Sequence, residues 1–177
     1  MENVDNFLNP NKILNQLKLR KDMIAGDFGC GTGGWAIPLA KKLEDGKVYA
    51  LDIQEEMLSA LKSHSQLEKI YNIETRLCDL EREGGSGLPE NSLDLVLLTN
   101  LLFQLEDKKT VLKEIKKVLK RKGVLLIVDW QPGASFGPRE GRISAEEVKK
   151  LASEVGLKLK KEFNASVHHY GLIFIKE

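Results

Sequence analysis

Cysteine is scarce in this sequence of 177 residues, which contains two, Cys30 and Cys78. Their spacing fits no metal-binding pattern and their number gives no disulfide framework, so we expect no metal site and a reducing, cytoplasmic location. Apolar runs are short and the first residues are polar, so we expect neither a membrane span nor a secretory leader. Excess charge is also absent: the formal net charge is +1, whereas a nucleic-acid partner usually requires a basic stripe.

The remaining composition is that of an ordinary globular protein, with 42% hydrophobic and 30% charged residues. The length predicts a single domain over residues 1–177. Residues 1–20 are expected to form an N-terminal arm and a helix, which begins at Asn9-Pro10 because proline favours the first helical position. Two interpretations stay open for this segment: a helix that only packs on the domain, or a flap over a ligand with Phe7 as its apolar finger.

Strand and helix patterns alternate along the chain, which is typical of an open α/β sheet with helices on both faces. We expect strands over residues 23–28, 48–51, 73–77, 93–98, 124–128, 157–163 and 170–175. We expect helices over residues 35–43, 55–67, 107–120 and 144–155. Gly123 should end the third of these helices, and Ser144 with Glu147 should form a capping box on the fourth. The last two strands should form a hairpin whose turn, residues 164–169, lies at the ligand-binding edge.

A glycine-rich turn, Gly29-Cys30-Gly31-Thr32-Gly33-Gly34, joins the first strand to the helix that follows it. Strand, glycine turn and helix together form a cradle for the polar part of a nucleotide-like ligand. The turn also matches the dinucleotide pattern GxGxxG, so a nicotinamide-dependent oxidoreductase stays open as a distant alternative. Asp27 disfavours that alternative, because a carboxylate would repel a pyrophosphate and suits a ligand with a cationic amine.

Acidic side chains also stand at the ends of two other apolar strands, at the edge where such sheets bind ligands. Asp52 follows Gly31 by 21 positions (52 − 31), which suits an acid that accepts hydrogen bonds from two ribose hydroxyls. Asp79 could accept the exocyclic amine of an adenine, with Ile53 and Leu80 forming an apolar slot for the ring. Each aspartate could instead cap the helix or strand end beside it.

Four stretches in matching order and spacing, residues 27–33, 48–53, 77–80 and 88–96, resemble the motifs of class I S-adenosylmethionine-dependent methyltransferases. Residues 131–138 and 142–144 resemble the small ubiquinone/menaquinone-biosynthesis-type (methyltransferase type 11-like) group. The resemblance implies a Rossmann-like three-layer sandwich on a seven-stranded, mostly parallel sheet, of order 3-2-1-4-5-7-6 with the last strand antiparallel. Gly26 departs from the family pattern, so we expect the first strand to be locally loosened.

The resemblance also implies S-adenosyl-L-methionine as cofactor and S-adenosyl-L-homocysteine as product. The glycine turn would pack against the methionine part of the cofactor, and Asp27 would assist its ammonium group directly or through water. Asp52 would hold the ribose hydroxyls, and Asp79 would meet the adenine amine. The expected cofactor-binding residues are Asp27, Gly29, Cys30, Gly31, Gly33, Trp35, Asp52, Ile53, Met57, Cys78, Asp79, Leu80 and Asn100.

The methyl acceptor has no motif of its own in the sequence. The expected topology brings the hairpin residues His168, His169 and Tyr170 close to it, together with Trp130 and Arg142, although a solvated turn stays open for the two histidines. The fourth strand end lacks the Asn-Pro-Pro-Tyr type motif of enzymes that methylate base amines, so we expect a small, partly apolar molecule and no nucleic acid. The chain should be a monomer or homodimer. The alternative function is a cofactor-binding subunit or regulator without transfer activity.

Overall fold

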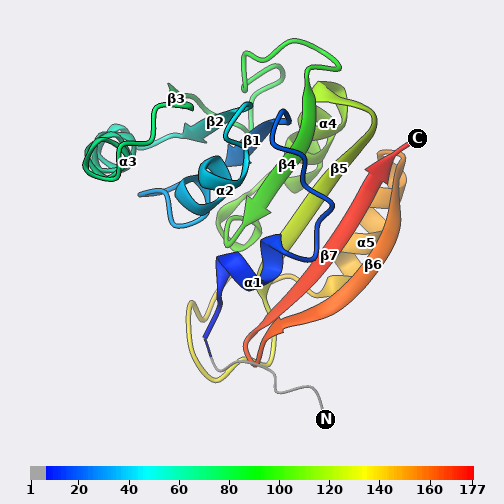
Figure 1. Ribbon diagram of the computed structural model, residues 1–177. Helices are drawn as coiled ribbons and strands as arrows, with labels where there is room; N and C mark the ends of the chain where they lie inside the picture. The colour runs from blue at the N-terminus through cyan, green and yellow to red at the C-terminus, as the bar shows by residue number, and fades with distance from the viewer. Residues whose placement is uncertain (1–6) are drawn as a thin grey trace.

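One seven-stranded sheet organises the computed structural model, which describes residues 7–177 (Figure 1). The strand order is β3-β2-β1-β4-β5-β7-β6, and β7 runs antiparallel to both of its neighbours. The strands are β1 Ile24–Phe28, β2 Lys47–Asp52, β3 Ile73–Leu77, β4 Leu93–Thr99, β5 Leu119–Trp130, β6 Leu157–Ser166 and β7 His169–Lys176. The predicted fold class and strand order are therefore confirmed.

Helices cover both faces of the sheet and complete a three-layer sandwich, with one buried apolar cluster on each face. Figure 1 shows α1 and α2 on one face and α4 and α5 on the other. The helices are α1 Pro10–Leu14, α2 Ala36–Lys42, α3 Glu55–Leu67, α4 Lys108–Val118 and α5 Ala145–Glu154, with a short 3-10 helix η1 at Leu102–Gln104. Within the described residues, none of these helices is long and apolar enough to cross a membrane.

The N-terminal helix starts where its sequence predicts. The Asn9 side chain accepts a hydrogen bond from the Lys12 backbone N–H at 3.2 Å, and Pro10 occupies the first helical position. Ile13 and Leu14 are buried against the face that α2 covers. Residues 1–6 of the predicted arm lie outside the described residues. Whether the arm closes over a ligand stays a prediction.

Strand β1 is regular through Gly26, so the expected loosening there is wrong. Gly26 pairs with Tyr49 on one side and Val96 on the other. A Cβ at this position would lie 2.8 Å from the Phe28 ring and 2.9 Å from Leu93. The space that a branched residue would fill is therefore taken by two large neighbours, and the strand keeps its pairing.

The predicted end of helix α4 is also wrong: it ends at Val118, before Lys120, and Gly123 lies within β5. The backbone N–H groups of Asn91 and Ser92 donate to the last helical carbonyls, of Lys117 and Val118, at 3.0 and 2.8 Å. These bonds satisfy the carbonyls that a C-terminal glycine motif would otherwise satisfy. The chain can therefore pass directly from helix into strand.

The predicted capping box is confirmed, because Ser144 and Glu147 exchange both of its hydrogen bonds. The final hairpin is confirmed as well, but its turn is shorter than residues 164–169. Strand β6 ends at Ser166 and β7 begins at His169, so two residues connect them. His169 is therefore a strand residue with fixed neighbours, opposite Trp130 of β5 and Ser166 of β6.

Candidate active site

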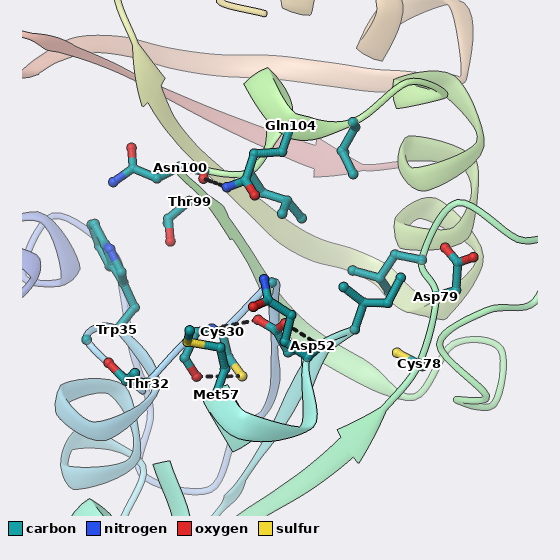
Figure 2. A pocket seen from close by; sticks show the side chains of 18 of the residues that line it. Cys30, Thr32, Trp35, Asp52, Met57, Cys78, Asp79, Thr99, Asn100 and Gln104 are labelled. Carbon is teal, nitrogen blue, oxygen red and sulfur yellow. Dashed lines mark hydrogen bonds between the residues drawn. The ribbon is translucent and has the colours of Figure 1, made fainter. Parts of the chain in front are cut away.

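A cleft of about 460 Å³ opens at the carboxyl edge of the parallel strands (Figure 2). Figure 2 shows Asp52 in its middle, with Trp35 and Asn100 on one side and Cys78 and Asp79 on the other. Its volume is that of a small-molecule site. The described residues that line it are Gly29, Cys30, Gly31, Thr32, Gly34, Trp35, Asp52, Ile53, Gln54, Met57, Cys78, Asp79, Leu80, Glu81, Thr99, Asn100, Leu101, Gln104 and Leu105.

The glycine turn forms a floor of bare backbone for this cleft. The N–H groups of Gly29 and Cys30 both donate to the Leu51 carbonyl, at 2.8 and 2.9 Å, which ties the turn to β2. Gly31, at φ +53°, and Gly34 both line the cleft, and a Cβ built on either would meet no atom within 4 Å. A side chain at either position would therefore project into open space, which suits a ligand that packs directly on the turn.

Asp52 is held at the centre of the cleft by two backbone N–H groups. Its Oδ2 accepts a hydrogen bond from Gly31 at 2.8 Å, and its Oδ1 accepts one from Gln54 at 3.0 Å. Each carboxylate oxygen can accept a further hydrogen bond. The glycine turn therefore helps to fix the orientation of the Asp52 carboxylate, and both predicted interpretations of Asp52, a cap and a ligand, are compatible with its position.

Asp27 lies where direct contact with a ligand in the cleft is blocked, so of the two predicted modes the contact through water stays a prediction. It is fully buried beneath the turn, and it is not among the described residues that line the cleft. Neither carboxylate oxygen has a hydrogen-bond partner within residues 7–177. Burial, and to a lesser degree the negative charge of Asp52, raises the pKa of Asp27 to about 7; the nearby backbone N–H of Ala36, which does not reach hydrogen-bond geometry, opposes the shift only weakly. Gly33 is likewise absent from the described lining.

The wall opposite Trp35 provides an apolar slot with a carboxylate at its end. Ile53 is 64% exposed although it is apolar, and Leu80 is buried. Asp79 accepts hydrogen bonds from the Glu81 N–H at 3.0 Å and from Arg82 Nε at 3.1 Å. The two thiols of the cleft, Cys30 and Cys78, form no disulfide, and that of Cys30 donates a hydrogen bond to the Gly31 carbonyl at 3.5 Å. Burial raises the pKa of both, that of Cys78 to about 11, so they are neutral and weakly nucleophilic.

The segment after β4 closes the cleft, and the sequence prediction found only its first residue, Asn100. Gln104 Nε2 donates to the Asn100 carbonyl at 3.1 Å, the bond drawn in Figure 2. The carboxylate of Glu81 accepts the N–H groups of Glu106 and Asp107, both at 2.6 Å, and joins the two rims of the cleft. Glu81 and Gln104 carry no motif, and their position after a strand end is the one signal the sequence offers.

A second cavity, of about 540 Å³, adjoins the first. Its described lining consists of Phe7, Leu8, Asn100, Trp130, Phe136, Val167, His168 and His169. Asn100 lines both cavities, so they meet at the end of β4. The rings of Trp130 and His169 are 4.1 Å apart, and those of Trp130 and Phe136 are 6.3 Å apart. The structure therefore brings together three of the predicted acceptor-side residues, Trp130, His168 and His169.

The other two predicted acceptor-side residues, Tyr170 and Arg142, are not among the described residues that line this cavity. Tyr170 is buried on the opposite face of the sheet, where its hydroxyl donates to the Ile143 carbonyl at 3.0 Å. Arg142 donates to five backbone carbonyls of the loop between β5 and α5: Gln131, Pro132, Ala134, Phe136 and Pro138. Both side chains therefore donate to backbone carbonyls: Arg142 within the loop that carries Phe136, and Tyr170 on the other face of the sheet.

Comparison with solved structures agrees with this arrangement. A SAM dependent methyltransferase from Aquifex aeolicus superposes with a TM-score of 0.88 at 26% identity, over 97% of this chain and 92% of that one. The cyclase SpnF also superposes, with a TM-score of 0.81 over 94% of this chain and 79% of that one, at 14% identity. The second likeness shows the fold alone, and it reminds us that this fold supports more than one chemistry.

Comparison of sequences gives the family. The demethylmenaquinone methyltransferase of Geobacillus stearothermophilus is 30% identical over 131 residues, which are 72% of this chain and 54% of that protein. The chain thus spans about half the length of the curated relatives it matches. The family model described as a methyltransferase domain matches residues 19–171, which include the first cleft and most of the second cavity. The chain belongs to this methyltransferase domain family.

Proposed function

We propose that the protein is an S-adenosylmethionine-dependent methyltransferase that acts on a small-molecule acceptor. One observation carries the proposal: a cleft built on a bare glycine turn, with Asp52 fixed at its centre, meets a second, aromatic cavity at Asn100. Two adjoining cavities are what a transfer between a cofactor and an acceptor requires. The family of the chain and its likeness to the Aquifex aeolicus protein support the same activity.

The residues of the first cleft fit the proposed cofactor in chemistry as well as in position. Gly31 and Gly34 leave open space for the methionine part, and the oxygens of Asp52 can accept hydrogen bonds from ribose hydroxyls. Ile53 and Leu80 offer apolar surface for the adenine ring, with Asp79 positioned for its amine. S-adenosylmethionine supplies, when bound, an electrophilic methyl group on a sulfonium, so the protein needs mainly to align the acceptor and exclude water.

The second cavity is where we place the acceptor. Trp130 and Phe136 supply flat apolar walls, and Asn100 adds a polar group at the junction with the first cleft. Phe7 is 85% exposed and Phe136 is 70% exposed, so a ligand lying there would cover two of the largest exposed apolar side chains. The curated relatives are named for demethylmenaquinone; from that name we carry over only the class, a small molecule with an apolar body.

Calorimetry with S-adenosylhomocysteine tests the cofactor half of this proposal. We expect S-adenosylhomocysteine to bind at one site per chain. A lack of binding would refute the proposed methyltransferase activity. A crystal structure with S-adenosylhomocysteine then tests the second half: an open second cavity beside the sulfur is expected, whereas a plugged one would favour a cofactor-binding subunit without transfer activity. We further propose a cytoplasmic monomer or homodimer, consistent with the free thiols of Cys30 and Cys78, and sedimentation of the purified chain would reveal a larger assembly.

A further inference from the structure

Two buried polar atoms at the second cavity lack a hydrogen-bond partner within residues 7–177: Nε2 of His169 and Oδ1 of Asn100. Both residues line that cavity, and His169 is 5% exposed. Buried polar groups are paired in the great majority of cases, because an unpaired one is costly. Two unpaired groups that share one cavity therefore point to a ligand that supplies their partners.

The hydrogen bonds of Ser166 determine which nitrogen of His169 carries the proton. The Ser166 hydroxyl is buried, accepts the His168 N–H at 3.1 Å, and lies 2.8 Å from Nδ1 of His169. A hydroxyl has one hydrogen to donate, and Nδ1 is its one acceptor in the described part of the chain. If Nδ1 carried the proton, the hydroxyl hydrogen would be left without an acceptor. Nδ1 is therefore the acceptor, and Nε2 carries the hydrogen.

A histidine in this state is a hydrogen-bond donor toward a ligand and offers it no lone pair. Burial, with a smaller contribution from neighbouring His168, lowers the pKa of His169 to about 4, so the ring is neutral at physiological pH. Its basic nitrogen, Nδ1, is already engaged by Ser166. His169 is thus unsuited to remove a proton from the acceptor.

The other residues that line the cavity indicate the chemistry of the molecule that would accept this hydrogen bond. None of its described lining residues is an Asp, Glu, Lys or Arg. Three ring contacts, Trp130–His169, Trp130–Phe136 and Phe136–His168, border it. A cationic acceptor would find no carboxylate among the described lining residues, whereas a flat, uncharged one would stack on the rings.

We propose that Ser166 holds His169 as its Nε2–H tautomer and that this N–H binds a carbonyl or hydroxyl oxygen of a neutral, planar methyl acceptor. His169 is then a substrate-binding residue and Ser166 a positioning residue. Asn100 Oδ1 accepts a hydrogen bond from the same molecule where that molecule carries a hydroxyl. The inference rests on the proposed function for the identity of the ligand, while the tautomer is a property of the protein alone.

The tautomer is measured first, on the full chain labelled with ¹⁵N-histidine, from the long-range ¹H–¹⁵N couplings of the ring. We expect Nδ1 of His169 to resonate as an acceptor and Nε2 as a protonated nitrogen, unchanged from pH 5 to 8. Ser166→Ala should mix the two tautomers, and Ser166→Thr, which keeps the hydroxyl, should restore the single one. His64→Gln identifies the ring signals of the exposed His64 by their loss. This variant is the matched control, because it should leave the signals of His169 unchanged. An Nδ1–H tautomer in the unaltered chain would overturn the proposal.

The ligand is tested with 1-naphthol and its near-isostere 1-methylnaphthalene, with S-adenosylhomocysteine saturating. We expect 1-naphthol to bind on the order of 10-fold more tightly, because one hydrogen bond to a buried donor distinguishes the two probes. His169→Gln should keep much of this preference and His169→Phe should lose it. Two results would overturn this inference alone. One is that His169→Phe prefers 1-naphthol as strongly as the unaltered chain does; the other is that neither probe binds while S-adenosylhomocysteine does. Loss of S-adenosylhomocysteine binding in the unaltered chain refutes the proposed function instead.

Discussion

Replacing the buried Asp27 by Asn should stabilise the protein, and the gain should grow with pH. Both carboxylate oxygens lack a hydrogen-bond partner within the described residues, and burial raises the pKa of Asp27 from 3.8 to about 7. Between these two values the folded chain binds one proton more than the unfolded chain. The free energy of unfolding therefore falls as pH rises through this interval, and it levels off above pH 7.

The size of the effect follows from the same shift. A difference of about three pH units, at 1.36 kcal/mol per unit, gives a loss of about 4 kcal/mol between pH 4 and pH 8. Water penetration around a charged Asp27 would reduce that loss, so we expect about 2–4 kcal/mol. Asn is close to the protonated carboxyl in shape and does not titrate. Asp27→Asn should therefore match the unaltered chain near pH 4 and exceed its stability by about 2–4 kcal/mol at pH 8.

Urea unfolding of both proteins at pH 4, 5, 6, 7 and 8 measures this difference directly. Other buried acids, such as Asp129, whose pKa burial raises to about 6, titrate in both proteins and cancel. Glu83→Gln, at an exposed carboxylate, is the control and should show no such trend. A stability difference between Asp27→Asn and the unaltered chain that stays constant from pH 4 to 8 would refute the reasoning, since Asp27 would then not titrate in the fold.

Three further substitutions separate the roles assigned above. Asp52→Ala should weaken S-adenosylhomocysteine binding in calorimetry by roughly 10- to 100-fold, because charge-assisted hydrogen bonds contribute about 1.5–3 kcal/mol each, while Asp27→Asn should change it far less. Arg142→Ala removes the donor to five loop carbonyls, so residues 131–142 should exchange their amide hydrogens faster and 1-naphthol should bind more weakly, with S-adenosylhomocysteine affinity unchanged. Tyr170→Phe loses the hydrogen bond to Ile143 and should lower stability in urea by about 1 kcal/mol; a loss of 1-naphthol binding without a loss of stability would return Tyr170 to the acceptor site.

The order of helices and strands was predictable because hydrophobic runs and glycine turns are local signals. The order of strands in the sheet came from the family resemblance, because the sequence of a strand does not show which other strands it pairs with. The end of α4 shows the limit of local signals. Its last carbonyls are satisfied by Asn91 and Ser92, which lie about 25 residues away along the chain, so a C-terminal glycine was unnecessary. Gly26 failed as a sign of loosening for a similar reason, because Phe28 and Leu93 fill its space.

The site was predictable where a polar residue follows a buried strand and its side chain faces the ligand edge, as for Asp52, Asp79 and Asn100. Asp27 has the same kind of position, but it lies inside β1, and its side chain is fully buried and absent from the described lining of the cleft. Sequence alone does not say which way a strand-end residue turns. Glu81 was missed because it lies on a connecting segment, and Gln104 because the 3-10 helix that it ends is too short to give a periodic pattern.

The buried carboxylate of Asp129 links the walls of the two cavities, although it is not among the described residues that line either one. Its Oδ2 accepts the N–H of Leu102, in the segment that walls the first cleft, at 2.8 Å. Its Oδ1 accepts the N–H of Trp130, a wall of the second cavity, also at 2.8 Å. One carboxylate thus ties a wall of the first cleft to a wall of the second cavity. An in-line methyl transfer depends on the separation of these two walls, because a small misplacement of reacting atoms is costly. A polar residue at the end of a strand can therefore serve transfer without facing either ligand.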